Sequence, residues 1–210
     1  MSERELRERI ALYGKSLFDR GLTSGSSGNI SVKLPDGMLI TPTNSCLGRL
    51  DPDRIAKVDN NKIVVAGDKP SKEFFLHQAM YDSRPNEQAI VHLHSTYSVA
   101  VSCLEGVDPN DVLPPITAYY VMRVGTLPLV PYFAPGDEKL AEAVASASKL
   151  SRAVLLSNHG PVVAGKSLDA AMNATEELEE TAKLFLMLRN EKTRFLDEAQ
   201  VADLKQRFPS

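Results

Sequence analysis

The chain has 210 residues, of which 43% are hydrophobic and 24% charged, with a formal net charge of -3 and a pI of about 5.8. This length suits one large domain, whose core needs no disulfides to be stable. The mild acidity and the lack of a basic stripe argue against a nucleic-acid partner, and no apolar run approaches the ~20 residues of a membrane span.

The start of the chain predicts a helix rather than a targeting segment. Ser2 and Glu5 form a capping-box pattern, and Leu6, Ile10 and Leu17 mark the buried stripe of a helix that ends at Gly21. A charged-then-apolar signal region is not seen, so we expect a cytoplasmic protein. The two cysteines, Cys46 and Cys103, form no C-x-x-C pair, and we expect reduced thiols that pack rather than react.

Short strands and helices alternate along the rest of the chain. Pro35-Asp36-Gly37 reads as the turn of a hairpin, and Ser71 as the N-cap of the second helix. Strands in the middle with helices around them predict a layered α/β domain with a partly antiparallel sheet. The expected strands cover residues 30–34, 38–41, 62–66, 89–94, 127–130, 153–157 and 161–164, and the later helices cover 96–104, 137–150 and 167–189.

Three of the four histidines predict a metal site. On a strand His92 and His94 point to the same face, with Cα atoms roughly 7 Å apart, although such a pair also arises by chance on half-buried strands. His159 follows an apolar strand beside Gly160, where a side chain can emerge from a rigid base. Three imidazoles and a nearby carboxylate suit Zn²⁺, with Mn²⁺ or Co²⁺ as alternatives. His77 is expected to be an ordinary helix residue.

Glu73 is the candidate carboxylate, and it lies beside a candidate anion site. As a simple structural feature, an acidic residue in the first turn stabilises a helix through the helix dipole. As a functional feature, the free N–H groups at this helix start bind phosphate, with Ser71 and Lys72 adding a hydroxyl and a charge. The turns at Gly28-Asn29 and Thr43-Asn44 could complete the same pocket.

Five motifs, in this order, resemble the class II aldolase/adducin family, which includes L-fuculose-1-phosphate aldolase and L-ribulose-5-phosphate 4-epimerase. The motifs are Gly28-Asn29-Ile30-Ser31, Ile40-Thr41-Pro42-Thr43, Ser71-Lys72-Glu73, His92-x-His94 and Asn158-His159-Gly160. The resemblance implies one domain over residues 1–210, with a core of about 5–190 and a tail of 191–210. It implies a three-layer α/β/α sandwich with a mixed, largely antiparallel central sheet, and a homotetramer.

By motif position, the resemblance also implies roles for individual residues. His92, His94, His159 and Glu73 would bind the metal, and Glu73 would also be the acid/base. Tyr119 and Tyr120 are candidates for a second acid/base, or for packing at a subunit interface. Gly28, Asn29, Thr43, Asn44, Ser71 and Lys72 would line the phosphate and substrate pocket.

Lys72 departs from the family aldolases, which often have serine there, and Asn44 replaces a common glycine. The added charge suits a phosphorylated sugar acid. The run from Thr41 to Leu50, together with Lys69–Glu73 and His92–Ser102, resembles the subgroup that decarboxylates 3-oxo-tetronate 4-phosphate to dihydroxyacetone phosphate and CO₂. In that reaction a metal-bound enediolate would form and Glu73 would deliver a proton to C2.

Two other functions stay open from the sequence. A sugar-phosphate aldolase passes through the same enediolate, so the same site residues would serve it. An adducin-like scaffold without catalysis is the alternative of another class, but such domains are expected to lack the metal ligands. His92, His94, His159 and Glu73 are all present in this chain.

Overall fold

The computed structural model describes residues 1–134 and 137–208. One sheet of eight strands runs in the order β4-β3-β2-β1-β5-β8-β7-β6. Every neighbouring pair is antiparallel except β6 with β7. The strands are β1 (Asn29–Leu34), β2 (Gly37–Ile40), β3 (Ala56–Asp59), β4 (Val64–Ala66), β5 (Ala89–His92), β6 (Leu129–Val130), β7 (Ala153–Leu156) and β8 (Gly160–Gly165).

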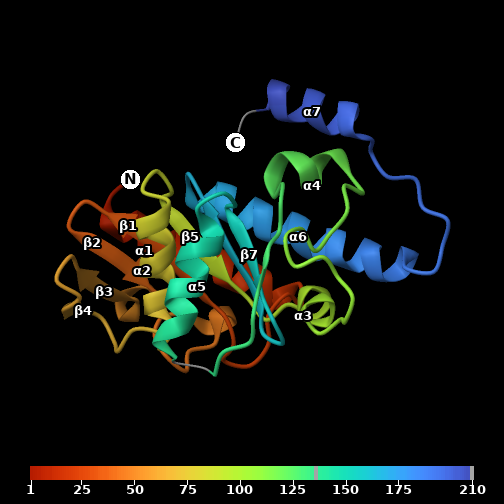
Figure 1. The fold of residues 1–210 in the computed structure, drawn as a ribbon. Helices are drawn as coiled ribbons and strands as arrows, with labels where there is room; N and C mark the ends of the chain where they lie inside the picture. Colours follow the sequence, from red (N-terminus) through yellow and green to blue (C-terminus); the bar gives the residue numbers. More distant parts are fainter. Residues whose placement is uncertain (135–136, 209–210) are drawn as a thin grey trace.

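Helices cover both faces of this sheet, with α5 in front of it and α6 behind it in Figure 1. Apart from two short 3-10 turns, Leu47–Arg49 and Pro52–Arg54, the helices of the described residues are α1 (Glu3–Asp19), α2 (Phe74–Ser83), α3 (Thr96–Ser102), α4 (Ala118–Arg123), α5 (Glu138–Ser148), α6 (Leu168–Leu188) and α7 (Glu198–Arg207). The prediction of a three-layer α/β/α sandwich with a mixed, largely antiparallel sheet is confirmed.

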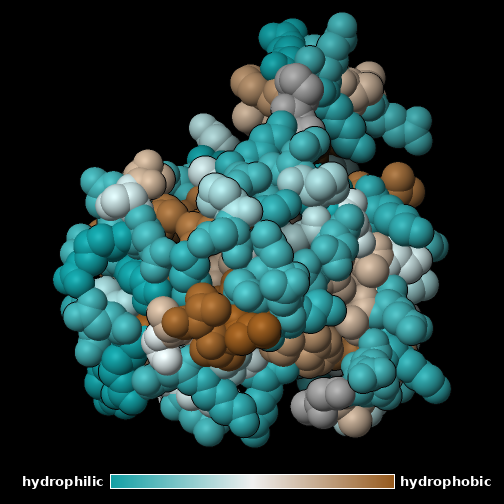
Figure 2. Space-filling view, turned by 90° about the vertical axis from the view of Figure 1, so that its left-hand side faces the viewer, coloured by the Kyte–Doolittle hydropathy of each residue, from teal (hydrophilic) through white to brown (hydrophobic). Residues whose placement is uncertain are grey.

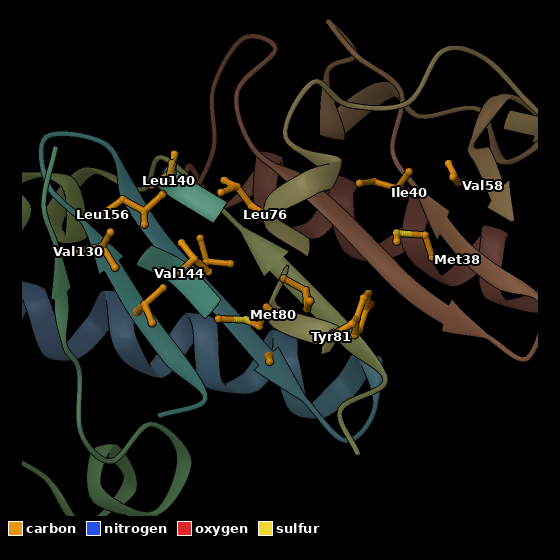
Figure 3. Close-up of a cluster of buried hydrophobic side chains, with 14 of the residues drawn as sticks. Met38, Ile40, Val58, Leu76, Met80, Tyr81, Val130, Leu140, Val144 and Leu156 are labelled. Carbon is orange, nitrogen blue, oxygen red and sulfur yellow. The ribbon is translucent and has the colours of Figure 1, made fainter. Parts of the chain in front are cut away.

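Alternation of side chains along the strands separates the core into two layers. On β5, Ile90 faces α2 and α5, and it lies in a cluster with Leu76 and Val144. Figure 3 shows how side chains from α2 and α5 meet those of the strands in this cluster. Ala89 and Val91 face the other way, toward α1 and α6. Each fully buried aliphatic side chain contributes roughly 1.5–3 kcal/mol, so these two layers hold the sheet in place.

Most of the predicted elements are present, with shifted ends. The Ser2–Glu5 capping box forms, and the hairpin turn joins β1 to β2 as expected. The strand predicted over residues 89–94 ends at His92, so His94 lies beyond it. Besides the two 3-10 turns, three described elements were not predicted: β3, α4 and α7. Of the predicted tail, residues 198–207 form α7 beside α4 (Figure 1), and residues 209–210 lie outside the described part.

The edge strand β4 leaves an apolar surface uncovered. Ile63, Val64 and Val65 expose 59, 44 and 54% of their surface. Figure 2, which views the molecule from the side of β3 and β4, shows an apolar patch on an otherwise mostly hydrophilic face. Exposed apolar patches on edge strands favour association with another chain. Among the helices described, none is both long and apolar enough to cross a membrane.

Candidate metal centre and substrate pocket

Two neighbouring strands bring the three histidines together. His92 is the last residue of β5 and is paired with Val162 of β8, while His159 lies in the turn that joins β7 to β8. That turn passes very close to the chain after β5, because a Cβ added to Gly160 would lie 2.2 Å from the carbonyl oxygen of Leu93. Gly160 also has a φ of +154°. Only glycine therefore lets His159 approach the H-x-H segment.

The ring nitrogens of these histidines converge on one point. Nε2 of His94 lies 3.1 Å from Nε2 of His92 and 3.0 Å from Nε2 of His159. The carboxylate of Glu73 lies 3.4 Å from His92 Nε2 and 3.2 Å from His159 Nε2. Four tetrahedral ligands at Zn²⁺ bond lengths lie about 3.3 Å from one another. The four residues thus fit one divalent ion, which agrees with the predicted ligand set.

The buried histidine of the set is already oriented for metal binding. His92 is fully buried, and its Nδ1–H donates to the carbonyl oxygen of Pro161 at 2.8 Å. This bond fixes the tautomer that leaves Nε2 free to bind a metal. His94, at the rim of the pocket, and His159 supply the other two nitrogens. Glu73, His94 and His159 also line the cavity, so an ion held by these residues would be next to it.

Glu73 reaches the histidines because its helix begins later than expected. Ser71 is not the N-cap of α2, so that prediction is wrong. Its hydroxyl accepts a bond from the Glu73 N–H at 3.2 Å, its carbonyl accepts one from the Phe74 N–H at 3.1 Å, and α2 starts at Phe74. This extra turn places Glu73 at the cap position. The carboxylate makes no capping bond and turns to the histidines instead, which favours the functional interpretation over simple helix stabilisation.

Charge and hydrogen bonding keep Glu73 ionised. Burial by itself would raise the pKa of Glu73, but attraction to His92 and hydrogen bonds from His159 and Asn29 outweigh it and hold the pKa below its usual range. A bound cation would act in the same direction. Desolvation of the ring, and then repulsion by His92 and His159, lowers the pKa of His94 to about 4. His92, whose pKa is also lowered by burial, and His94 are therefore neutral near pH 7, which is the form that binds metal.

All six residues predicted to hold substrate line one cavity beside this cluster. The cavity has a volume of about 350 Å³ and is also lined by Glu73, His94 and His159. Its polar wall is formed by Gly28, Asn29, Thr43, Asn44, Ser71 and Lys72. Lys72 is exposed and, in residues 1–134 and 137–208, forms no ion pair. The arrangement places the residues predicted to bind an anion next to the cluster of Glu73 and the histidines.

The two tyrosines do not lie at this cavity. Tyr120 is 2% exposed in the core between α3, α4 and α6, and burial raises its pKa well above the usual range. Tyr119 is 57% exposed, with the guanidinium of Arg123 over its ring. Within its own chain neither hydroxyl reaches the pocket, and the acid/base role of these residues stays a prediction.

His77 is the residue that sequence reasoning missed. It was expected to be an ordinary helix residue, but it is fully buried and hydrogen-bonded to Ser31 and Asn29. Asn29 in turn donates to Glu73. One signal was available: His77 lies four residues after Glu73, the N-cap residue of α2, a spacing at which side chains are neighbours on a helix.

The model of the Class II Aldolase and Adducin N-terminal domain matches residues 8–186. The chain belongs to this family. It is 51% identical, over 97% of its length and 96% of the relative's, to the 3-oxo-tetronate 4-phosphate decarboxylase of Escherichia coli O6:H1. It is 37% identical to the L-fuculose phosphate aldolase of Haemophilus influenzae, over 90% of this chain and 85% of that one. Among solved structures, YgbL from Escherichia coli superposes with a TM-score of 0.94 and 48% identity, covering 97% of this chain and 99% of that one.

A consequence of the lowered pKa of His94 is that the metal-free protein should lose stability in mild acid. Because the pKa of His94 falls from 6.5 to about 4 on folding, the unfolded chain takes up a proton between these pH values and the folded chain does not. The free energy of unfolding should therefore fall as the pH is lowered through this range and be insensitive to His94 above it. Urea unfolding with a chelator at pH 7 and pH 5 measures the effect, and His94→Ala should reduce it. An equal pH dependence in both proteins would contradict the assignment.

Proposed function

We propose that this chain is a metal-dependent carbon–carbon lyase that decarboxylates 3-oxo-tetronate 4-phosphate to dihydroxyacetone phosphate and CO₂. One observation carries the proposal: the ligand atoms of Glu73, His92, His94 and His159 all lie within 4.8 Å of one another, at the wall of a cavity lined by the anion-binding residues. The higher identity to the decarboxylase than to the aldolase favours this reaction. A cytoplasmic enzyme with residues 1–210 as one domain is part of the proposal.

The metal is proposed to be Zn²⁺, with Mn²⁺ or Co²⁺ as alternatives, held by His92, His94, His159 and Glu73. Neutral imidazoles with one carboxylate suit these ions. When bound, the ion supplies Lewis-acid stabilisation of the negative charge that develops on the substrate. Each ~1.4 kcal/mol of such stabilisation is worth tenfold in rate.

The side chains of the pocket orient the substrate and transfer one proton to it. Ser71, Lys72 and the turns at Asn29 and Thr43 would bind the C4 phosphate. When the C1–C2 bond breaks, CO₂ leaves and its electron pair passes into the C3 carbonyl, which gives an enediolate. Glu73 then delivers a proton to C2. Because Glu73 is ionised at rest, it must first take that proton from water in the pocket, so each turnover consumes one proton.

Product analysis tests this function directly. The purified, metal-loaded protein would be incubated with 3-oxo-tetronate 4-phosphate labelled with ¹³C at C1, and the products followed by ¹³C NMR. We expect labelled CO₂ and bicarbonate together with unlabelled dihydroxyacetone phosphate. Cleavage of L-fuculose 1-phosphate to an aldehyde, without CO₂ from the labelled acid, would support the aldolase alternative instead. Protein that binds no divalent metal and is inert toward both would support the adducin-like scaffold.

Lys72 is expected to raise affinity for the doubly anionic substrate. Replacing it by serine removes a charged hydrogen-bond donor, a change worth about 1.5–3 kcal/mol, so KM should rise roughly tenfold or more while kcat changes little. Lys69→Ser is the matched control, because Lys69 is also exposed but does not line the cavity. Steady-state kinetics of the two variants check this, and an equal KM for Lys72→Ser and wild type would exclude the role.

The enzyme is also proposed to be a homotetramer, as the family resemblance implies. The apolar surface of Ile63, Val64 and Val65 on the edge strand supports association between chains. Sedimentation velocity measures the number of chains directly.

A further inference from the structure

Behind the metal centre, four buried or half-buried hydrogen bonds connect five side chains in one line. The hydroxyl of Tyr81 lies 2.9 Å from Ser31 Oγ, which lies 2.6 Å from His77 Nδ1. On the other side of the ring, His77 Nε2 lies 2.5 Å from Asn29 Oδ1. Asn29 Nδ2 donates to Glu73 Oε2 at 2.8 Å. The line runs from the middle of the core, between α2 and β1, to the acid/base of the proposed reaction.

The orientation of the Asn29 amide sets one direction for these bonds. Its nitrogen donates to Glu73 Oε2, so its oxygen faces His77 Nε2. The oxygen then needs a donor, which requires the proton of the neutral imidazole on Nε2. His77 Nδ1 is left as an acceptor for the Ser31 hydroxyl, and Ser31 accepts from Tyr81. In the reverse direction the Asn29 oxygen would face the carboxylate.

We infer that His77 is a positioning residue, which holds the side-chain amide of Asn29 in the one orientation that supports the Glu73 carboxylate beside the metal ligands. This inference rests on the proposed function for the role of Glu73 but not on the identity of the substrate. In the described structure His77 itself neither lines the cavity nor belongs to the group of four residues whose ligand atoms converge. It acts through Asn29, which lines the cavity.

The surroundings of His77 suit a fixed neutral ring. The side chain is fully buried, and burial, followed by repulsion from His92, lowers its pKa to about 3. The ring therefore stays neutral at every pH at which the enzyme is expected to work, and its single proton can remain on Nε2. Outer partners of metal ligands of this kind typically change metal affinity or activity by 10–100-fold when they are removed.

A pair of variants tests the inference. Glutamine can place an amide N–H near the position of Nε2 and restore the bond to Asn29, whereas leucine fills the space without a donor. We expect His77→Leu to lower kcat and to weaken Zn²⁺ retention against a chelator, each by roughly 10–100-fold. His77→Gln should recover most of both. Because the inference says that His77 acts through Asn29, adding His77→Leu to Asn29→Ala should lower kcat and Zn²⁺ retention by less than a further twofold.

Two results would overturn the inference. One is that His77→Leu lowers kcat and Zn²⁺ retention by the same factor in the wild-type and Asn29→Ala backgrounds, which would show a purely structural role. The other is ¹⁵N NMR of the metal-loaded wild type that places the His77 proton on Nδ1, a measurement that needs no variant to fold. Zn²⁺ retention and NMR do not require turnover. If the wild type released no CO₂ but these two readouts behaved as expected, the proposed function would fail and the inference would stand.

Discussion

Replacing His94 by alanine is expected to remove the metal and nearly all activity while leaving the fold intact. His94 provides the Nε2 atom that lies closest to both other imidazoles, so its loss leaves an incomplete ligand set. Metal-assisted charge stabilisation is worth several kcal/mol, which corresponds to a fall of roughly 10³-fold in kcat/KM. Metal content by mass spectrometry and CO₂ release measure the two effects on one preparation.

The fold of this variant can be checked separately from its metal content. The side chain of His94 is exposed at the rim of the cavity, so its removal leaves no hole in the core. In the presence of a chelator, wild type and His94→Ala should therefore unfold at about the same temperature, and only the wild type should gain stability when Zn²⁺ is added. A variant that keeps one metal per chain and full activity would show that His94 is not a ligand.

Replacing Glu73 by glutamine is expected to separate proton transfer from metal binding. The amide keeps the shape of the side chain but loses the proton-carrying group, and general acid–base catalysis typically contributes 10²–10⁴-fold. We therefore expect kcat to fall by roughly that factor, while the three histidines retain a metal with reduced affinity. Pre-steady-state CO₂ release and metal titration of the same protein distinguish the two effects.

The matched control for Glu73→Gln is Asp82→Asn, which makes the same chemical change on the same helix. Asp82 is exposed, and within residues 1–134 and 137–208 its side chain is hydrogen-bonded only to Gln78 of its own helix, so its replacement should leave kcat unaltered. If Glu73→Gln were as active as Asp82→Asn, another group would have to deliver the proton to C2, and the tyrosines of α4 would become the first residues to test.

The convergence of His92 and His94, two of the proposed metal ligands, could be predicted from the sequence because these residues are near neighbours in the chain. β5 ends at His92, so strand alternation does not reach His94, but His94 follows only two residues later and its Nε2 lies 3.1 Å from that of His92. The position of His159 could not be predicted from its neighbours in the chain, because only the antiparallel pairing of β5 with β8 brings its turn to the end of β5. The order of five family motifs supplied that information where periodicity could not.

His77 and the late start of α2 could not be predicted in the same way. The partners of His77 lie 46 and 48 residues away on β1, and no local pattern reveals such contacts. The Ser71 pattern favoured a cap, but the hydroxyl formed a turn bond that competes with capping. Among the elements that were not predicted, β3 gives a weak strand signal because two of its four residues are polar. In contrast, α7 does have a local signal, a capping box at Asp197 and Gln200.

The most direct test of the central claim is a metal titration of the chelator-treated enzyme, with CO₂ release from 3-oxo-tetronate 4-phosphate as the readout. If a single ion at Glu73, His92, His94 and His159 supports the reaction, activity should rise linearly with added Zn²⁺ and stop rising at one equivalent per chain. Full CO₂ release by the metal-free protein, or none at any metal content, would contradict this account.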